Sequence, residues 1–299
     1  MSDAALAAMP GQHRRAARDP LLIVGLLLAG AAAIFAVFGT WIAPFDPTIA
    51  SPDVGQPPPP LGAWPALLLQ SFTGRLAEPV HWFGTDDTGL DILSRVIVAP
   101  RADLTIALAA CVLSATLGVG LGLLAGFFRH WSTELLMRVS DVMQSFPVFI
   151  SAMILVAMAG RSYVNIVVAL ALLYTPIYVR LTRAEVLGQV SRGYVQAARA
   201  MGNPAWKLAL RHVLPNSLAP AIIQSSVTIG FAILLTAGLS FVGAGVRPPT
   251  PEWGLMIANG AGGIVNGEWW PSVFPGIAIS LTVFGFAAIG NALEQRYDR

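Results

Sequence analysis

Six long apolar stretches, separated by polar segments, divide the sequence. They lie at about residues 21–42, 104–128, 142–160, 164–181, 217–245 and 271–293. A helix of about 20 apolar residues crosses the hydrocarbon layer of a membrane. The pattern therefore predicts an all-α membrane protein with six transmembrane helices. Pro147 and Pro176 fall within the third and fourth stretches, where proline removes a helix hydrogen bond and predicts a kink.

Composition supports a chain that is surrounded by membrane lipid. Hydrophobic residues make up 55% of it and charged residues 11%, whereas soluble domains carry about 25% charged residues. The formal net charge of +2 and the lack of any run of like charges predict that no nucleic acid is bound. A single cysteine, Cys111, excludes an internal disulfide.

Basic residues are distributed unevenly among the polar segments. Thirteen of the 18 Lys and Arg residues lie in the segments on one side and five in the alternating segments, which predicts that both termini are cytoplasmic. The first apolar stretch is too long for the core of a signal peptide, so we expect it to be retained. The expected layout is a cytoplasmic tail at 1–20, a transmembrane helix at 21–42, a periplasmic segment with a Pro-rich insert at 43–102, and five further helices at 103–299.

The sequence lacks the usual signatures of catalysis and ion coupling. The expected spans hold almost no ionisable residues away from their ends, which disfavours a secondary transporter. The only lysine, Lys207, follows Trp206 and belongs to no phosphate-binding loop. The four histidines are scattered, and neither HExxH nor GxSxG occurs. We therefore expect no catalytic residue, no metal site and no cofactor in this chain.

The polar stretch YVQAARAMGNPAWKLALRHVLPN, residues 194–216, interrupts the apolar pattern. Its first half predicts a short amphipathic helix with an apolar stripe at helical spacing, formed by Tyr194, Ala197, Ala198 and Met201. The opposite flank is polar and carries Arg192, Gln196 and Arg199. Three hypotheses apply: a helix lying on lipid headgroups, a DNA-binding helix-turn-helix, or a rigid element that fits a groove of a cytoplasmic protein. Membrane spans on both sides exclude the second.

A Gly-Asn-Pro break separates this helix from the next. Gly202 is expected to end the first helix in the left-handed conformation. Asn203 is expected to cap the second helix and Pro204 to occupy its first position. The second helix should then run through residues 205–214.

Before the second span, the stretch HWFGTDDTGLDILSRV groups Asp86, Asp87 and Asp91 in front of a helical run. Capping of that helix and docking of an external partner both remain open. After the second span, RHWSTELLMRVSDVM predicts an interfacial helix with an i,i+4 pair between Glu134 and Arg138. Four polar residues in or near the spans are expected to form interhelical hydrogen bonds, namely Gln144, Asn165, Gln224 and Asn291.

Several motifs resemble a known family. The stretch at 194–216 is similar to the EAA signature loop of permease subunits of bacterial ABC importers. It matches that pattern at Ala197, Ala198, Gly202, Leu214 and Pro215, and departs from it at Gln196, where the family usually has glutamate. FGTDDTGLDILSRV and GLSFVGAGVRPPTPEWGLMI resemble segments of the C-type permeases of dipeptide, oligopeptide and nickel importers.

This resemblance implies a type I ABC importer permease fold in the bacterial inner membrane, with a coupling helix in an EAA loop at 184–216. It implies transport of di- or oligopeptides, with nickel or another small solute as an alternative and a scaffold or channel without ATP coupling as a distant one. The implied partners are a second homologous permease, a periplasmic substrate-binding protein and two cytoplasmic ATPase subunits, which would bind ATP and Mg.

The resemblance also assigns residues. Coupling to the ATPase would involve Tyr194, Gln196, Ala197, Ala198, Arg199, Met201, Gly202, Leu214 and Pro215. The family's periplasmic motif would comprise Gly84, Thr85, Asp86, Gly89, Asp91, Ser94 and Arg95. Consecutive small-xxx-small steps at Gly118, Gly122 and Gly126 allow close helix approach, either within this subunit or against the second permease.

Overall fold

A computed structural model describes residues 20–72, 80–128 and 130–297. Throughout these ranges the regular elements are helical, apart from one isolated bridge between Thr85 and Asp91. Five helices are long and apolar enough to cross a membrane, and a bent helix pair provides a sixth crossing when it is counted as one span. The predicted all-α membrane fold is confirmed.

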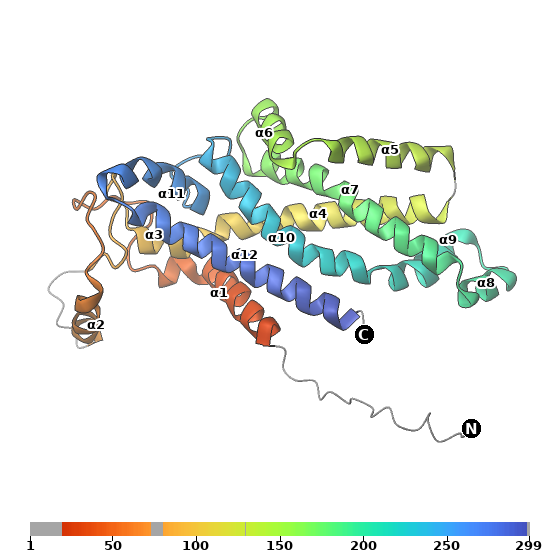
Figure 1. The fold of residues 1–299 in the computed structure, drawn as a ribbon, viewed down its shortest axis with the longest axis horizontal. Coiled ribbons are helices and arrows are strands. Elements are labelled where there is room, and N and C mark those ends of the chain that lie inside the picture. Colours follow the sequence, from red (N-terminus) through yellow and green to blue (C-terminus); the bar gives the residue numbers. More distant parts are fainter. Residues whose placement is uncertain (1–19, 73–79, 129, 298–299) are drawn as a thin grey trace, which may run out of the picture.

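Five long helices run lengthwise through the molecule (Figure 1). They are α1 (Pro20–Ile42), α4 (Pro100–Phe127), α7 (Tyr163–Val190), α10 (Ala219–Phe241) and α12 (Trp270–Tyr297). α4 packs along α7, α10 packs against both α4 and α12, and α1 packs against α12. The main apolar core lies where these helices meet.

The glycine stripe of α4 explains its close contact with α7. A Cβ atom added at Gly122 would lie 2.7 Å from Thr182 Cβ, and one added at Gly126 would lie 2.7 Å from Val186 Cβ. Ordinary carbon contacts begin at about 3.4 Å, so only glycine permits this approach. The sequence left open whether the stripe packs within this chain or against a second permease. The contact with α7 shows that it packs within the chain.

The third apolar stretch is not the single helix expected over 142–160. α5 (Trp131–Ser145) and α6 (Val148–Ala159) meet at an angle of 96°. The break falls at Phe146, whose backbone is extended, because a residue that precedes a proline is disfavoured in the helical region. α5, which the sequence predicts as an interfacial helix, contacts α7 and α4 and runs lengthwise beside α7 (Figure 1).

The fourth helix is longer than the hydrophobic pattern predicted. α7 continues through Pro176 and ends at Val190, beyond the expected end near residue 181. Its last turns contain Leu, Arg, Ala and Glu, which are good helix formers irrespective of hydropathy. The expected cytoplasmic loop at 184–216 therefore begins inside this helix.

Short helices gather at the two ends of the bundle (Figure 1). The loop end contains α8 (Gly193–Ala200), α9 (Ala205–Lys207), η2 (Leu208–Val213) and η3 (Leu214–Ser217). We call the opposite end the clamp end. It contains η1 (Leu61–Ala63), α2 (Trp64–Phe72), α3 (Ile92–Val98), α11 (Trp253–Gly260) and η4 (Ala261–Asn266).

Candidate functional sites at the two ends of the bundle

At the loop end, α8 directs most of its predicted apolar stripe outward. The exposed fractions of Tyr194 and Met201 are 41% and 75%, and Ala197 is also exposed, whereas Ala198 is buried. The helix is anchored by Val195, which the sequence analysis did not single out. Val195 belongs to a buried apolar cluster whose other members are Leu123, Val186, Ala209 and Val213.

The Gly-Asn-Pro break is formed differently from the prediction. Gly202 has a φ of +81°, which confirms the left-handed conformation. The predicted cap is wrong, because the N-cap position of α9 is Pro204 and no side chain caps this helix. Asn203 Nδ2 donates to the carbonyl of Ala198 at 2.8 Å, which satisfies a carbonyl at the end of α8. Pro204 precedes the first residue of α9 and is not itself that residue.

Beyond the break, the expected single helix is divided into three pieces. α9 is followed by the π-helical turn η2 and then by the 3-10 turn η3, which contains Leu214 and Pro215. Trp206 and Leu210 are 65% and 53% exposed. With Tyr194 and Met201, the loop end thus exposes four large apolar side chains.

Hydrogen bonds connect α8 to the helices on both sides of the loop. Tyr194 Oη donates to Gln189 Oε1 of α7 at 2.8 Å. The Gln189 Nε2 atom in turn donates to Glu185 Oε1 at 3.0 Å and to the carbonyl of Asn216 at 3.3 Å. Since Asn216 lies in η3, just before α10, this network joins α7, α8 and the start of α10.

Gln196, the residue that departs from the EAA pattern, also bonds within the chain. Its Nε2 atom donates to the carbonyl of Val190 at 2.9 Å, at the end of α7. An ionised glutamate has no proton to donate, so it cannot form this bond. The amide thus provides one more connection between α8 and α7.

At the clamp end, the stretch around Gly84 holds the segment that follows α1. Thr85 N donates to the carbonyl of Gln56, and Gln56 N donates to Thr85 Oγ1, both at 2.9 Å. Trp270 Nε1 donates to the carbonyl of Thr85 at 2.9 Å. This exchange fastens the segment near Gln56 to the start of α12.

The acidic residues of this motif are largely buried, and they bond locally. Asp91 Oδ2 accepts from Ser94 N at 2.7 Å and caps α3, and its Oδ1 lies 2.8 Å from His81 Nδ1. Asp86 Oδ1 accepts from Leu90 N at 2.8 Å within the turn. Of the two alternatives left open, capping is therefore observed for Asp91.

The remaining motif residues also have partners within the chain. Ser94 Oγ accepts from Phe45 N at 3.0 Å, and Arg95 donates to the carbonyl of Pro47 at 3.4 Å. Gly84 and Gly89 have φ of +76° and +81°, and an added Cβ atom at either would collide with a carbonyl of the segment that follows α1. The seven predicted residues thus lie together and hold that segment in place.

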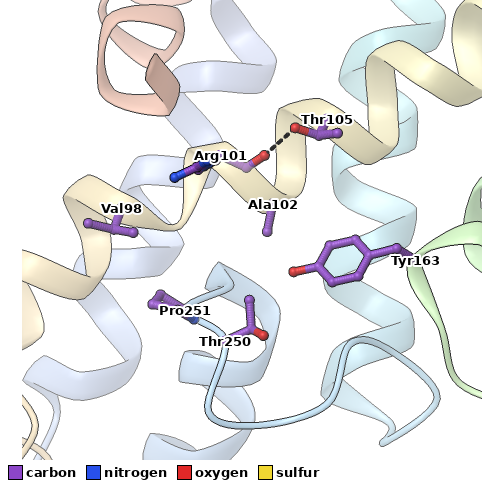
Figure 2. A pocket seen from close by; sticks show the side chains of 7 residues that line it. All are labelled: Val98, Arg101, Ala102, Thr105, Tyr163, Thr250 and Pro251. Carbon is purple, nitrogen blue, oxygen red and sulfur yellow. Dashed lines mark hydrogen bonds between the residues drawn. The ribbon is translucent and has the colours of Figure 1, made fainter. Parts of the chain in front are cut away.

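A cavity of about 350 Å³ lies near the clamp end, between the starts of α4 and α7 and the loop before α11 (Figure 2). Its lining residues are Val98, Arg101, Ala102, Thr105, Tyr163, Thr250 and Pro251. The Tyr163 side chain extends toward Thr250, while the Thr105 hydroxyl donates to the carbonyl of Arg101 at 2.5 Å (Figure 2). The Thr105 hydroxyl thus has its hydrogen-bond partner within its own helix.

Comparison with known proteins places these features in a family. Residues 118–299 match the family described as binding-protein-dependent transport system inner membrane component. The chain belongs to this family. The permease is 39% identical, over 96% of its length and 88% of the relative's, to the di/tripeptide transport system permease protein DppC of Pseudomonas aeruginosa. It is 40% identical to the dipeptide transport system permease protein DppC of Escherichia coli K12, over 94% of its length and 89% of that relative's.

Two buried acids of the permease were not predicted from the sequence. Asp103, near the start of α4, is fully buried and accepts from Trp253 N at 3.3 Å. Glu252, also buried, caps α11 by accepting from Gly254 N and Leu255 N at 2.9 and 2.7 Å. In the sequence both acids border apolar stretches, and this position could have indicated that they are buried. They join α4 to α11.

The expected interhelical hydrogen bonds of the permease form only in part. Asn165 Nδ2 donates to the carbonyls of Ala159 and Gly160 and closes the turn between α6 and α7. Gln224 and Asn291 instead bond within their own helices. Over the described ranges, no group of three or more His, Cys, Asp or Glu side chains is placed to hold a metal ion.

Proposed function

We propose that this permease forms half of the translocation path of an ATP-driven importer for di- or oligopeptides. The observation that carries the proposal is the loop end, where exposed apolar side chains are joined by hydrogen bonds to α7 and, through Gln189, to η3 just before α10. Relatives named for dipeptide and di/tripeptide transport support the substrate class. They favour a peptide over nickel or another small solute.

In this proposal the chain itself catalyses no reaction. A second, homologous permease completes the path, and a periplasmic binding protein delivers the peptide. Two cytoplasmic ATPase subunits bind ATP and Mg and supply the energy. The permease crosses the inner membrane several times with both termini in the cytoplasm, so that the loop end faces the ATPases and the clamp end faces the periplasm.

The loop end acts as the coupling element. Tyr194, Ala197 and Met201 offer an exposed surface to a groove of the ATPase, with Arg199 beside them on the polar flank. Behind this surface, the Tyr194–Gln189 and Gln196–Val190 bonds transmit displacement of α8 to α7. η3, which contains Leu214 and Pro215, transmits it to α10. ATP-driven closure of the ATPases would thereby tilt two helices of the path.

The periplasmic motif around Gly84 has a different proposed role. Its buried contacts hold the segment that follows α1 against α3 and α12, so that the face offered to the binding protein is already formed. Docking residues would then be found among the exposed side chains of that segment rather than in the motif itself.

The coupling role is tested most sharply at Gly202. A Cβ atom added there meets no atom within 4 Å, yet φ is +81°, so alanine introduces backbone strain without a clash. That strain costs about 1–2 kcal/mol. The free loop can relieve it by leaving the left-handed conformation, which docking must then restore, so ATPase binding weakens by about five- to thirtyfold. Gly193→Ala is the matched control, because this glycine is also unobstructed but has no positive φ.

The assay compares peptide uptake and ATPase co-purification at equal abundance in the membrane. We expect both to fall for Gly202→Ala, to recover partly for Gly202→Asn because asparagine tolerates the left-handed region, and to remain unchanged for Gly193→Ala. Normal ATPase binding by Gly202→Ala would refute the coupling assignment. Loss of this variant from the membrane would show that the glycine serves folding only.

A further inference from the structure

An exposed ion pair lies between α5 and α7. Arg180 Nη2 is 2.7 Å from Asp141 Oδ1, and the two side chains are 52% and 50% exposed. Asp141 was expected outside the spans, in the predicted interfacial helix. The packing of α5 along α7 instead brings this charge beside a lengthwise helix.

With α7 taken as one membrane crossing, its length places the pair within the depth of the hydrocarbon layer. α7 has 28 residues, which at 1.5 Å per residue gives about 42 Å, or about 12 Å more than the hydrocarbon layer. Arg180 precedes the end of α7 at Val190 by ten residues, about 15 Å along the axis. Even if the whole excess of α7 lay at the loop end, Arg180 would therefore remain within the hydrocarbon depth.

The pair belongs to a longer polar strip. We define this strip as Glu134, Arg138, Asp141 and Gln144 of α5 with Arg180 and Arg183 of α7. Gln144 Nε2 and Arg183 Nε are buried and have no hydrogen-bond partner within the described chain. The expected Glu134–Arg138 ion pair is not formed there either. The strip therefore offers donors and charges of both signs.

The outward face of α5 is divided lengthwise. Its other half is apolar and exposed, and consists of Trp131, Leu135, Val139 and Val142. Ionisable side chains within a membrane face a water-filled cavity or the interior of a bundle and avoid lipid. The charged half and the apolar half of α5 thus require different surroundings at the same depth.

We infer that the polar strip lines the water-filled path and contacts the charged ends of a zwitterionic peptide, with Arg180 facing its carboxylate and Asp141 its ammonium group. This inference rests on the proposed function, since the second permease must close the path. Charges of both signs suit a ligand that also carries both. An isolated cation or anion would match only half of the strip.

The first test measures water access in the assembled transporter, in membranes. Asp141→Cys and Val142→Cys are compared in a Cys111→Ser background, because these neighbours share a depth but lie on different halves of α5. We expect a charged methanethiosulfonate reagent to modify Asp141→Cys about tenfold faster, since the reactive thiolate forms in water and is suppressed in apolar surroundings. Equal rates at the two positions would overturn the inference. No reaction at Asp141→Cys would also overturn it, and is the result expected if the strip contacts the second permease.

The second test separates transport from coupling. Arg180→Gln should reduce uptake of dialanine several-fold while ATPase stimulation by the loaded binding protein is retained, and Val142→Ala should affect neither. Unchanged uptake by Arg180→Gln would overturn the ligand contact. Absence of ATPase stimulation in the unaltered transporter would instead refute the proposed function, so the two failures are distinguishable.

Discussion

The contact between α4 and α7 predicts a large effect from a single methyl group. In Gly122→Ala, the new Cβ atom would lie 2.7 Å from both Thr182 Cβ and the carbonyl oxygen of Val179. The backbone of α7 must therefore retreat by several tenths of an ångström. Overpacking of this kind costs about 1–3 kcal/mol, and we expect a corresponding decrease in the thermal unfolding temperature.

Gly120→Ala is a closely matched control. It adds the same methyl group two residues away on the same helix, where nothing lies within 4 Å. Replacing a glycine within a helix by alanine favours the helix by about 0.5–1 kcal/mol. We therefore expect this variant to be unchanged or slightly more stable than the original chain.

The assay is thermal unfolding in detergent, performed on the isolated permease and on the assembled transporter. Because the stripe contacts α7 of the same chain, Gly122→Ala should already be less stable when isolated. If only the assembled transporter were destabilised, the stripe would contact the second permease, and the reasoning from α4–α7 packing would be refuted. Equal effects of Gly120→Ala and Gly122→Ala would refute it as well.

Two further predictions concern the clamp end and the orientation. Asp91→Ala removes the cap of α3 and the partner of the buried His81, so the free energy of unfolding should fall by about 1–3 kcal/mol. Asp87→Ala, at an exposed position of the same loop, should change the free energy of unfolding little. Equal losses in the two variants would contradict the capping role. In a Cys111→Ser background, an impermeant maleimide should label Asp53→Cys in intact cells but label Ala205→Cys only after permeabilisation. The reverse pattern would show that the proposed orientation is inverted.

The class of fold and the identity of the motifs could be predicted from the sequence alone. Hydrophobic segments of membrane length determine the number of crossings almost by themselves, because the hydrocarbon layer imposes the same requirement on every span. The left-handed Gly202 was also predictable, since a glycine at the end of a short amphipathic helix has few other roles. These inferences depend on local composition and spacing.

Features that depend on contacts between distant segments were decided only by the tertiary structure. Hydropathy placed the third span at 142–160, but Pro147 bends the chain, and α5 becomes a lengthwise helix with charges beside Arg180. Asn203 was expected to act as a cap, yet it lies one residue before the N-cap position of α9 and its side chain donates back to the preceding helix. A local pattern specifies which groups need partners. Which partner each group obtains depends on how the helices pack, and the sequence pattern contains no direct record of that packing.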